Sequence, residues 1–362
     1  MMRIALVSDA WAPQINGVVR TLATTIAGLR ARGYDVTTVT PDMFVTVPCP
    51  GYREIRLAVL PGRCMRAMLD RARPDIVHIA TEGPLGWAAR GWCKRRGVPF
   101  TSAFHTRFPD YLAVRTGLPP SAFWPVMRWF HAGSRAVLAS TPRLAEELRE
   151  RGIENVRIWS RGVDLGNFNP RQAMPRAMAH LPRPIMLYVG RVSAEKNLPA
   201  FVGVPVAGSK VIVGDGPAFG VLKDKYWDAT FLGSLQGRDL AAAYAAADVF
   251  VFPSRTDTFG LVMVEALACG IPVAAFPVQG PLDIIGEDGR GSLFRSARPI
   301  GALSANLAEA IGAALKCDKD DCADFARRYD WNDCIEQFAS ALVDASGGAE
   351  RFSPELMACA AE

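Results

Sequence analysis

The sequence lacks the cysteine and histidine patterns of metal sites and of disulfide-stabilised domains. Its 8 cysteines form no CxxC pair and no cluster with zinc spacing, and it has only 4 histidines. Scattered cysteines of this kind are typical of reduced thiols in a cytosolic protein. No Asp-x-Asp follows a predicted strand, since Asp318-Lys-Asp320 lies in a charged stretch. We therefore expect no metal requirement.

Uninterrupted hydrophobic runs are also absent. The longest apolar stretch, residues 261–278, contains a glutamate, a glycine and two prolines. It therefore predicts a buried helix, a turn and a strand rather than a membrane span. The first residues, MMRIALVSDAW, predict a strand that is broken at Asp9, and not a signal peptide. These features favour a cytoplasmic location.

Alternating strands and helices fill both halves of the chain. At 362 residues and 50% hydrophobic content, the chain is long enough for two domains. The predicted strands lie at 3–8, 35–40, 76–79, 99–103 and 136–140, and then at 184–190, 210–213, 230–232, 249–252 and 272–276. The predicted helices lie at 18–32, 85–95, from Pro142 onward, 238–247 and 260–269. Repeated βαβ units predict an α/β fold of two Rossmann-like, doubly wound domains that face a cleft.

The boundaries of these domains follow from the restart of the alternation. We place the first domain at 1–163 and the second at 164–335, with the proline-rich segment 163–183 as the hinge. The last segment, 336–362, is predicted as a helical tail that packs back toward the first domain.

The charge is distributed unequally between the two halves. Up to Gly162 there are 23 Lys and Arg against 12 Asp and Glu, whereas the remainder has 18 against 24. The surplus of 11 positive charges indicates a first half that faces a polyanionic surface, or a basic surface that is simply solvated. No nucleic-acid-binding motif occurs among the basic residues, so we expect no nucleic-acid partner.

Two carboxylates, Asp257 and Glu265, flank the start of a predicted helix with seven residues between them. An apolar strand ends at Phe252, and the helix is entered through Gly260. Such a helix start presents free backbone N–H groups that suit a diphosphate. A carboxylate on each side suits the hydroxyls of a sugar and of a ribose. The layout predicts a nucleotide-sugar site, although Asp257 could also simply cap the helix.

Several motifs, in this order, resemble those of a retaining glycosyltransferase of family 4, which has the GT-B fold. They are SDAWAPQINGVVRTL (8–22), TSAFHTRFPDYL (101–112), WSRGVDLGNFNP (159–170), YVGRVSAEKNL (188–198), VIVGDGP (211–217) and the segment that contains the two carboxylates. The resemblance covers nearly the whole chain. It implies that a C-terminal helix crosses back to the first domain.

The resemblance also assigns the charged residues of a donor site. Arg191 and Lys196 would stabilise the leaving diphosphate, Glu265 would bind the ribose, and Asp257 would contact the transferred sugar. The family usually has Glu at the position of Asp257, which leaves the identity of the donor sugar open. The link between Lys196 and Lys210 is also short, with room for a turn or two of helix.

Backbone groups complete the implied donor site. The resemblance assigns to it five positions: Gly17, Gly216, Phe259, Gly260 and Leu261. Gly17 would approach the diphosphate from the first domain, because no Cβ intrudes there. The alternative for Gly17 is an ordinary turn.

His105 follows a predicted strand at the place where the family has a histidine that contacts the donor sugar and the reacting centre. The alternative is a structural histidine at a strand end. The resemblance implies transfer with retention, in which the acceptor attacks from the face that the diphosphate leaves. An oxygen of the diphosphate would receive the proton.

The acceptor is indicated less directly. Aromatic residues gather in the segment SAFWPVMRWFH (121–131), and four arginines run through 63–73, namely Arg63, Arg66, Arg71 and Arg73. Such a surface suits anionic lipid, although the aromatic residues could equally form a helix core. We expect a peripheral enzyme on the inner face of the cytoplasmic membrane that transfers a hexose from UDP-glucose, or a related UDP-sugar, to diacylglycerol. The alternatives are a GDP-mannose-dependent enzyme acting on phosphatidylinositol-type or soluble acceptors, and a nucleotide-sugar-binding protein without turnover.

Overall fold

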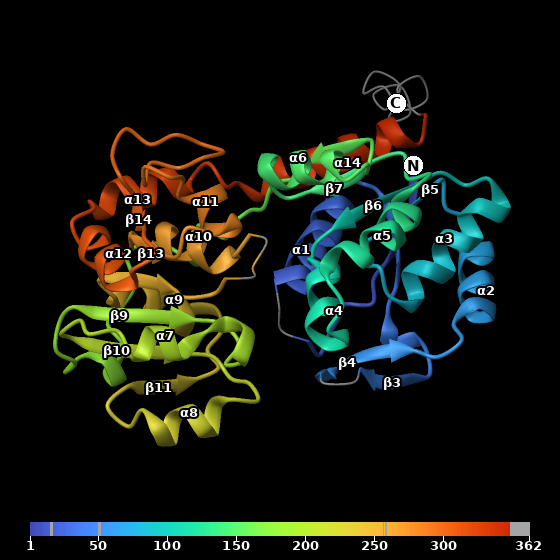
Figure 1. The fold of residues 1–362 in the computed structure, drawn as a ribbon. Coiled ribbons are helices and arrows are strands. Elements are labelled where there is room, and N and C mark those ends of the chain that lie inside the picture. Colours follow the sequence, from blue (N-terminus) through green and yellow to red (C-terminus); the bar gives the residue numbers. More distant parts are fainter. Residues whose placement is uncertain (15–16, 50–51, 256, 258, 348–362) are drawn as a thin grey trace. The chain divides into compact units, whose positions relative to one another are not determined.

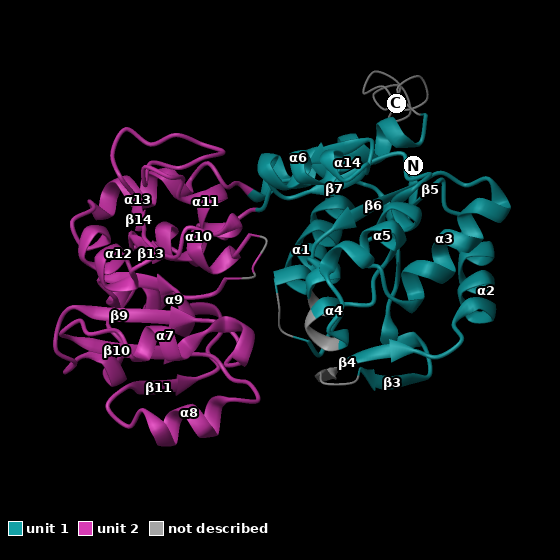
Figure 2. Cartoon of the chain, in the orientation of Figure 1, with its two compact units in different colours: residues 1–161, 331–362 teal, residues 162–330 magenta. Residues whose placement is uncertain are grey.

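The chain forms two compact units in the computed structural model, which describes residues 1–14, 17–49, 52–255, 257 and 259–347. Unit 1 comprises Met1–Arg161 and the segment that begins at Trp331, and unit 2 comprises Gly162–Asp330 (Figure 2). The chain thus passes between the units at Arg161 and again at Asp330, whereas the sequence analysis places these points after 163 and 335.

Unit 1 is built on a six-stranded parallel sheet (Figure 1). In sheet order its strands are β2 (Asp35–Val39), β1 (Arg3–Val7), β5 (Ile76–Ile79), β6 (Phe100–Phe104), β7 (Val137–Ala139) and β8 (Val156–Ile158). Its helices are α1 (Gly17–Ala31), α2 (Gly62–Ala72), α3 (Pro84–Arg96), α4 (Phe108–Thr116), α5 (Trp124–His131), α6 (Pro142–Glu150) and α14 (Trp331–Ala345), with short 3-10 turns η1 (Pro41–Met43) and η2 (Pro120–Ala122).

Unit 2 repeats this architecture with another six-stranded parallel sheet. In sheet order its strands are β11 (Thr230–Gly233), β10 (Ser209–Val213), β9 (Ile185–Val189), β12 (Val249–Phe252), β13 (Val273–Ala275) and β14 (Gly301–Leu303). Its helices are α7 (Leu198–Val202), α8 (Phe219–Lys225), α9 (Gly237–Ala246), α10 (Leu261–Ala268), α11 (Gln279–Ile284), α12 (Leu307–Ala314) and α13 (Lys319–Ala326), with 3-10 turns η3 (Arg176–Met178) and η4 (Ala194–Lys196). The prediction of two parallel-sheet, Rossmann-like domains is confirmed.

Local sequence explains the most regular of these elements. All five residues of β9 are buried, as a central parallel strand with both faces covered requires, and its sequence IMLYV is accordingly apolar throughout. Helix α6 begins as predicted, with Pro142 in its first turn and the Thr141 side chain accepting a hydrogen bond from the Leu144 N–H at 3.2 Å. Helix α7 has five residues, which agrees with the short link between Lys196 and Lys210.

Helix α14 packs against the sheet of unit 1 (Figure 1). Its buried face includes Ile335, Phe338 and Leu342, which join the core around β1 and β5. The Phe338 ring lies 4.7 Å from the rings of both His78 and Trp159. The predicted return of a C-terminal helix to the first domain is thus confirmed, and the helix already begins at Trp331.

The segment predicted as the hinge packs into unit 2. The Val163 N–H donates to the Tyr329 carbonyl at 2.9 Å, and Phe168 is buried in the core with Tyr244, 5.9 Å away between ring centres. The interpretation of 163–183 as a linker is therefore wrong, because its apolar side chains are needed in the core of unit 2.

An antiparallel hairpin in unit 1 has no counterpart in the sequence prediction. Strand β3 (Thr46–Cys49) pairs with β4 (Tyr52–Ala58) and lies between β2 and α2 along the chain. Among the described residues, no helix is both long and apolar enough to cross a membrane.

Replacing Phe338 by Ala should destabilise unit 1, because the cavity would lie between α14 and the sheet. Full burial of the ring predicts a loss of about 3–5 kcal/mol in the free energy of unfolding. Urea denaturation followed by circular dichroism measures this loss. The exposed Ser340 on the same helix is the matched control, and Ser340→Ala should unfold like the parent. Equal stabilities for the two variants would contradict the assigned packing.

Candidate functional site

The sheet of unit 2 has its switch point between β9 and β12. The chain runs outward from β9 to β10 and β11, and then returns to build β12, β13 and β14 on the other side. Loops that follow the two central strands therefore diverge, and ligands of doubly wound sheets bind at this place. The β9 loop carries Arg191 and Lys196, and the β12 loop carries Asp257.

The structure brings Lys196 and Asp257 together. The Lys196 Nζ donates to the Asp257 Oδ1 at 2.6 Å, and the side chains are 20% and 23% exposed. Asn197, with a left-handed backbone, holds the loops in place because its Nδ2 donates to the Pro253 carbonyl at 3.2 Å. An ammonium and a carboxylate thus lie side by side at the carboxyl end of the sheet.

The second oxygen of Asp257 is buried and has no hydrogen-bond partner among the described residues. A buried carboxylate oxygen without a partner is costly, because it has lost water and gained nothing in return. It is therefore an acceptor available to a hydroxyl group of a ligand. Asp257 is not the side-chain cap of α10, whose N-cap residue is Gly260 and has no side-chain cap.

Arg191 is fixed through its main chain. The Tyr188 hydroxyl donates to the Arg191 carbonyl at 2.8 Å. Burial, and then the charges of Asp257 and Glu195, raise the pKa of Tyr188 well above its usual value. The phenol therefore stays protonated and keeps its donor role.

Glycines allow the loops after β9 and β10 to touch. A Cβ on Gly214 would lie 1.9 Å from the Gly190 carbonyl oxygen, and one on Gly216 would lie 2.4 Å from that of Val192. The Val192 N–H in turn donates to the Asp215 carbonyl at 2.9 Å. Gly216 thus supports the loop of Arg191 by close backbone packing.

The entry into α10 is formed by Phe259, Gly260 and Leu261. Phe259 is buried, Gly260 has a left-handed φ of 88°, and Leu261 is the first helical residue. Gly280 at the start of α11 allows close contact here, since its Cβ would lie 2.8 Å from the Asp257 carbonyl oxygen.

Glu265 lies on α10 and is only 2% exposed. Its Oε2 accepts a hydrogen bond from the Tyr244 hydroxyl of α9 at 3.1 Å. The structure therefore places this carboxylate inside unit 2, beside α9.

Comparison with known proteins identifies the chain. Residues 15–167 match the model of Glycosyltransferase Family 4, and residues 183–316 match that of Glycosyl transferases group 1. A GDP-mannose-dependent alpha-mannosyltransferase of Mycobacterium tuberculosis is 32% identical over an alignment of 352 residues, and the match covers 90% of this chain and 91% of the relative. The chain belongs to glycosyltransferase family 4.

Further relatives agree with this assignment. An alpha-monoglucosyldiacylglycerol synthase of Acholeplasma laidlawii is 26% identical over 81% of this chain and 84% of its own. The structure of a sucrose-phosphate synthase from Thermosynechococcus elongatus superposes with a TM-score of 0.70 at 23% identity, over 94% of this chain and 98% of its own. The chain therefore has the GT-B fold and is a hexosyltransferase that uses a nucleotide sugar.

The candidate histidine, His105, follows β6 in unit 1 and is 9% exposed. Its Nδ1 lies 3.1 Å from an Nη2 of Arg161, and its ring meets Trp159 edge-on at 5.5 Å. Burial, followed by the charges of Arg161 and His78, lowers the pKa of His105 well below its usual value. Its imidazole is therefore neutral at physiological pH.

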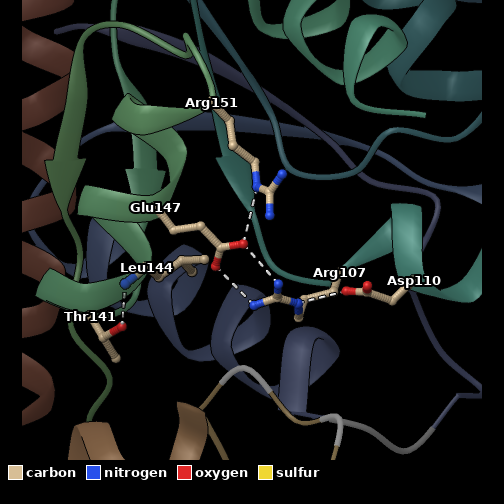
Figure 3. Close-up of polar contacts among 6 residues, drawn as sticks. All are labelled: Arg107, Asp110, Thr141, Leu144, Glu147 and Arg151. Carbon is tan, nitrogen blue, oxygen red and sulfur yellow. Dashed lines mark hydrogen bonds and ion pairs between the residues drawn. The ribbon is translucent and has the colours of Figure 1, made fainter. Parts of the chain in front are cut away.

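The turn after His105 is anchored to α6 (Figure 3). The Arg107 guanidinium donates to both carboxylate oxygens of Glu147, at 2.8 and 2.9 Å, and to Asp110 at 2.6 Å. Arg151 donates to the same Glu147 at 3.2 Å. Two-point pairing of Arg with a carboxylate fixes orientation as well as distance.

Gly17 is the first residue of α1, and its carbonyl accepts a hydrogen bond from the Thr21 hydroxyl at 2.7 Å. Its neighbours Ile15 and Asn16 lie outside the described residues. Nearby along the chain, Asp9 lies two residues after the end of β1 and accepts hydrogen bonds from the N–H groups of Leu85 and Gly86 at 2.9 and 3.3 Å. The Asp9 carboxylate therefore accepts hydrogen bonds from backbone N–H groups in the first turn of α3.

Sequence reasoning missed three supporting residues: Asn197, Tyr244 and Arg161. Asn197 and Arg161 lie inside quoted motifs, so their position was a usable signal, whereas nothing local marks Tyr244. Within the described part of the chain, no group of three or more His, Cys, Asp or Glu side chains could hold a metal ion. The expected metal independence stays a prediction.

Replacing Gly214 by Ala should force apart the loops that follow β9 and β10. Because the added methyl would meet a carbonyl oxygen, we expect a loss of about 2 kcal/mol or more in unfolding free energy. Gly220 of α8 is the matched control, because its Cβ would meet nothing within 4 Å. Thermal unfolding compares the variants, and a Gly214→Ala protein as stable as Gly220→Ala would refute the close contact.

Proposed function

We propose that this protein transfers a hexose, with retention and without a metal, from a nucleoside-diphosphate sugar to a hydroxyl group of a membrane lipid. The observation that carries the proposal is the pairing of Lys196 with Asp257 at the switch point of unit 2, with one Asp257 oxygen left for a ligand. The ammonium suits a phosphate, and the second carboxylate oxygen, which lacks a hydrogen-bond partner among the described residues, suits a sugar hydroxyl.

The chemistry follows from charge. When the glycosidic bond breaks, the diphosphate gains negative charge, and fixed cations stabilise that state more than the ground state. We assign this role to Lys196 and Arg191, with N–H groups at the start of α10 as further donors. The acceptor hydroxyl would attack from the face that the diphosphate leaves, and a diphosphate oxygen would take its proton. No second carboxylate is then needed as a nucleophile.

Two donors are supported by different observations. The motifs favour UDP-glucose or a related UDP-sugar, and an alpha-monoglucosyldiacylglycerol synthase is among the relatives. The higher identity and coverage of the GDP-mannose-dependent relative favour GDP-mannose. GDP-mannose is therefore the second candidate donor. We assign to Asp257, which stands where the family usually has Glu, the contact with the sugar hydroxyls that differ between the two donors.

A lipid acceptor is supported by an exposed apolar face on the β3–β4 hairpin. Val45 and Val47 of one strand stand opposite Val59 and Leu57 of the other, since Val47 pairs with Leu57 and the Val59 N–H donates to the Val45 carbonyl. Val45 is 80% exposed, and Leu60, which follows Val59, is 91% exposed. Apolar side chains this exposed on a paired strand face suit insertion among lipid tails.

Positive charge accompanies this hairpin face. Helix α2 begins two residues after Leu60, buries Met65 and Leu69, and exposes the arginines at 63, 66 and 71. In the described structure, none of these three arginines forms an ion pair. Unpaired arginines beside exposed valines and leucine complement an anionic lipid surface. We propose that this surface rests on the inner face of the cytoplasmic membrane.

The aromatic segment at 121–131 divides between the two alternatives. Trp124, Met127 and Phe130 of α5 are buried, whereas Trp129 is 52% exposed. Trp129 stacks on Trp87 at 5.0 Å and lies 3.7 Å from the Arg90 guanidinium. The aromatic residues Trp124 and Phe130 are therefore core, and Trp129 is the exposed aromatic residue of this helix.

Purified protein should convert a labelled donor and lipid acceptor into a glycolipid. UDP-glucose and GDP-mannose are each tested with diacylglycerol and phosphatidylinositol in anionic vesicles. Lys196→Ala should lower kcat about 100-fold or more, because one fixed cation at the leaving group is lost. The exposed Lys223→Ala is the control and should match the parent.

Further outcomes of this assay test the acceptor, the donor site, retention and metal independence. If no combination of donor and acceptor gives a glycolipid, the proposed transfer to a lipid is refuted. Near-normal turnover of Lys196→Ala would refute the donor site. The α-configuration of the product, read by NMR, and full activity in EDTA should both be found, and their absence would contradict retention and metal independence respectively.

Membrane binding can be tested separately by flotation with anionic vesicles. Leu60→Glu should reduce the floating fraction several-fold, because a charge replaces a highly exposed apolar side chain just after β4. Val221→Glu in unit 2, where Val221 is 71% exposed, should float like the parent. Salt should weaken binding, since it screens the arginines of α2. Equal flotation of both variants would exclude the hairpin as the contact surface.

A further inference from the structure

Arg161 is buried against the candidate histidine. It is 5% exposed and is the last residue of unit 1. Its Nη1 donates to the carbonyls of Trp159 and Ser160, at 2.7 and 3.0 Å, and its guanidinium carbon lies 4.5 Å from the centre of the Trp159 ring. The guanidinium is thus held at several points before it reaches the His105 Nδ1 at 3.1 Å.

The chemistry of this contact fixes the proton on the imidazole. A guanidinium has donors only, so the Nδ1 of His105 must accept and cannot carry a hydrogen. A neutral imidazole whose Nδ1 accepts carries its hydrogen on Nε2. A protonated ring would direct an N–H against the cation, which makes the charged form unfavourable.

From this geometry we propose that Arg161 is a positioning residue that fixes His105 as the neutral Nε2–H tautomer. His105 would then act as a fixed hydrogen-bond donor through Nε2 and would exchange no proton in the reaction. The catalytic part of this inference rests on the proposed transfer reaction, whereas the tautomer depends only on the contact itself.

Other groups around His105 agree with this assignment. Among the described residues, the titratable and charged groups that act on it are Arg161 and, from β5, His78. His78 is fully buried, and burial lowers its pKa to about 3, so it too is neutral. Behind Arg161, the Cys334 thiol of α14 donates to the Ser160 carbonyl at 3.2 Å. Burial lowers the pKa of Arg161 to about 10, which leaves it charged at neutral pH.

The first test reads the tautomer directly and needs no activity. With histidines labelled with nitrogen-15, NMR should show His105 protonated at Nε2 and without titration from about pH 5.5 to 8.5, where an ordinary histidine changes charge. The spectrum of His105→Gln identifies its signals among the 4 histidines. In Arg161→Met, His105 should titrate within this range or mix its tautomers. Arg157→Met, which removes an exposed arginine from the same segment, is the control and should leave the signals unchanged.

The second test is the pH dependence of transfer. The parent should show no limb in kcat that belongs to His105. Arg161→Met should lower kcat about tenfold to 100-fold, change the donor KM less, and gain a new decline on the acidic side as His105 protonates. Arg161→Lys restores a cation and a donor, and should recover part of the loss.

The outcomes separate this inference from the proposed function. An unchanged Nε2–H signal in Arg161→Met, or a His105 that titrates near neutral pH in the parent, would overturn the tautomer assignment whether or not any donor is turned over. If Arg161→Met misfolds, the titration of the parent and of Arg161→Lys decides. A changed tautomer with unchanged kcat would overturn the catalytic role of Arg161 and leave the donor site of unit 2 untouched.

Discussion

The adjacency of β9 and β12 is the constraint on which the candidate donor site depends. These strands are distant in sequence but pair directly, through Val249 with Met186 and Phe250 with Leu187. Their loops consequently leave the sheet at the same edge and turn to opposite sides. Lys196 and Asp257, 61 positions apart in the chain, can form an ion pair only because of this pairing. The place of a ligand site thus follows from strand order before any ligand is considered.

Close backbone packing keeps those loops in place. Gly214 and Gly216 let the loops after β9 and β10 meet where a side chain would collide with a carbonyl oxygen, and Asn197 links η4 to the β12 loop by a hydrogen bond. The charged side chains would do the chemistry, but the close packing of the loops at glycines sets how far apart these side chains lie. The buried Glu265 carboxylate likewise depends on a neighbour, because a carboxylate inside a domain needs a hydrogen-bond donor, and the Tyr244 hydroxyl is one.

The sequence predicted what local pattern and motif order determine. Apolar runs such as β9 and the capped start of α6 were placed within a residue, and the two carboxylates were correctly set around a helix start. The β3–β4 hairpin was missed although Val45-Thr-Val47 and Ile55-Arg-Leu57 alternate between apolar and polar residues, which is the pattern of a half-exposed strand. Contacts such as Arg161 with His105 and Lys196 with Asp257 depend on which segments the fold brings together. No spacing in the sequence encodes them.

The two units differ in the kind of polar group that they offer. Unit 2 presents an ion pair and N–H groups at its switch point, where charge would develop on a diphosphate. Unit 1 holds His105 neutral, with a permanent cation behind it. A change of charge on His105 would change the hydrogen bonds of its ring with pH. A tautomer fixed by a buried guanidinium removes that dependence, because the guanidinium can only donate. Permanent charge thus occurs in both units: in one the Lys196 ammonium pairs with the Asp257 carboxylate, and in the other the Arg161 guanidinium keeps a neighbouring imidazole uncharged.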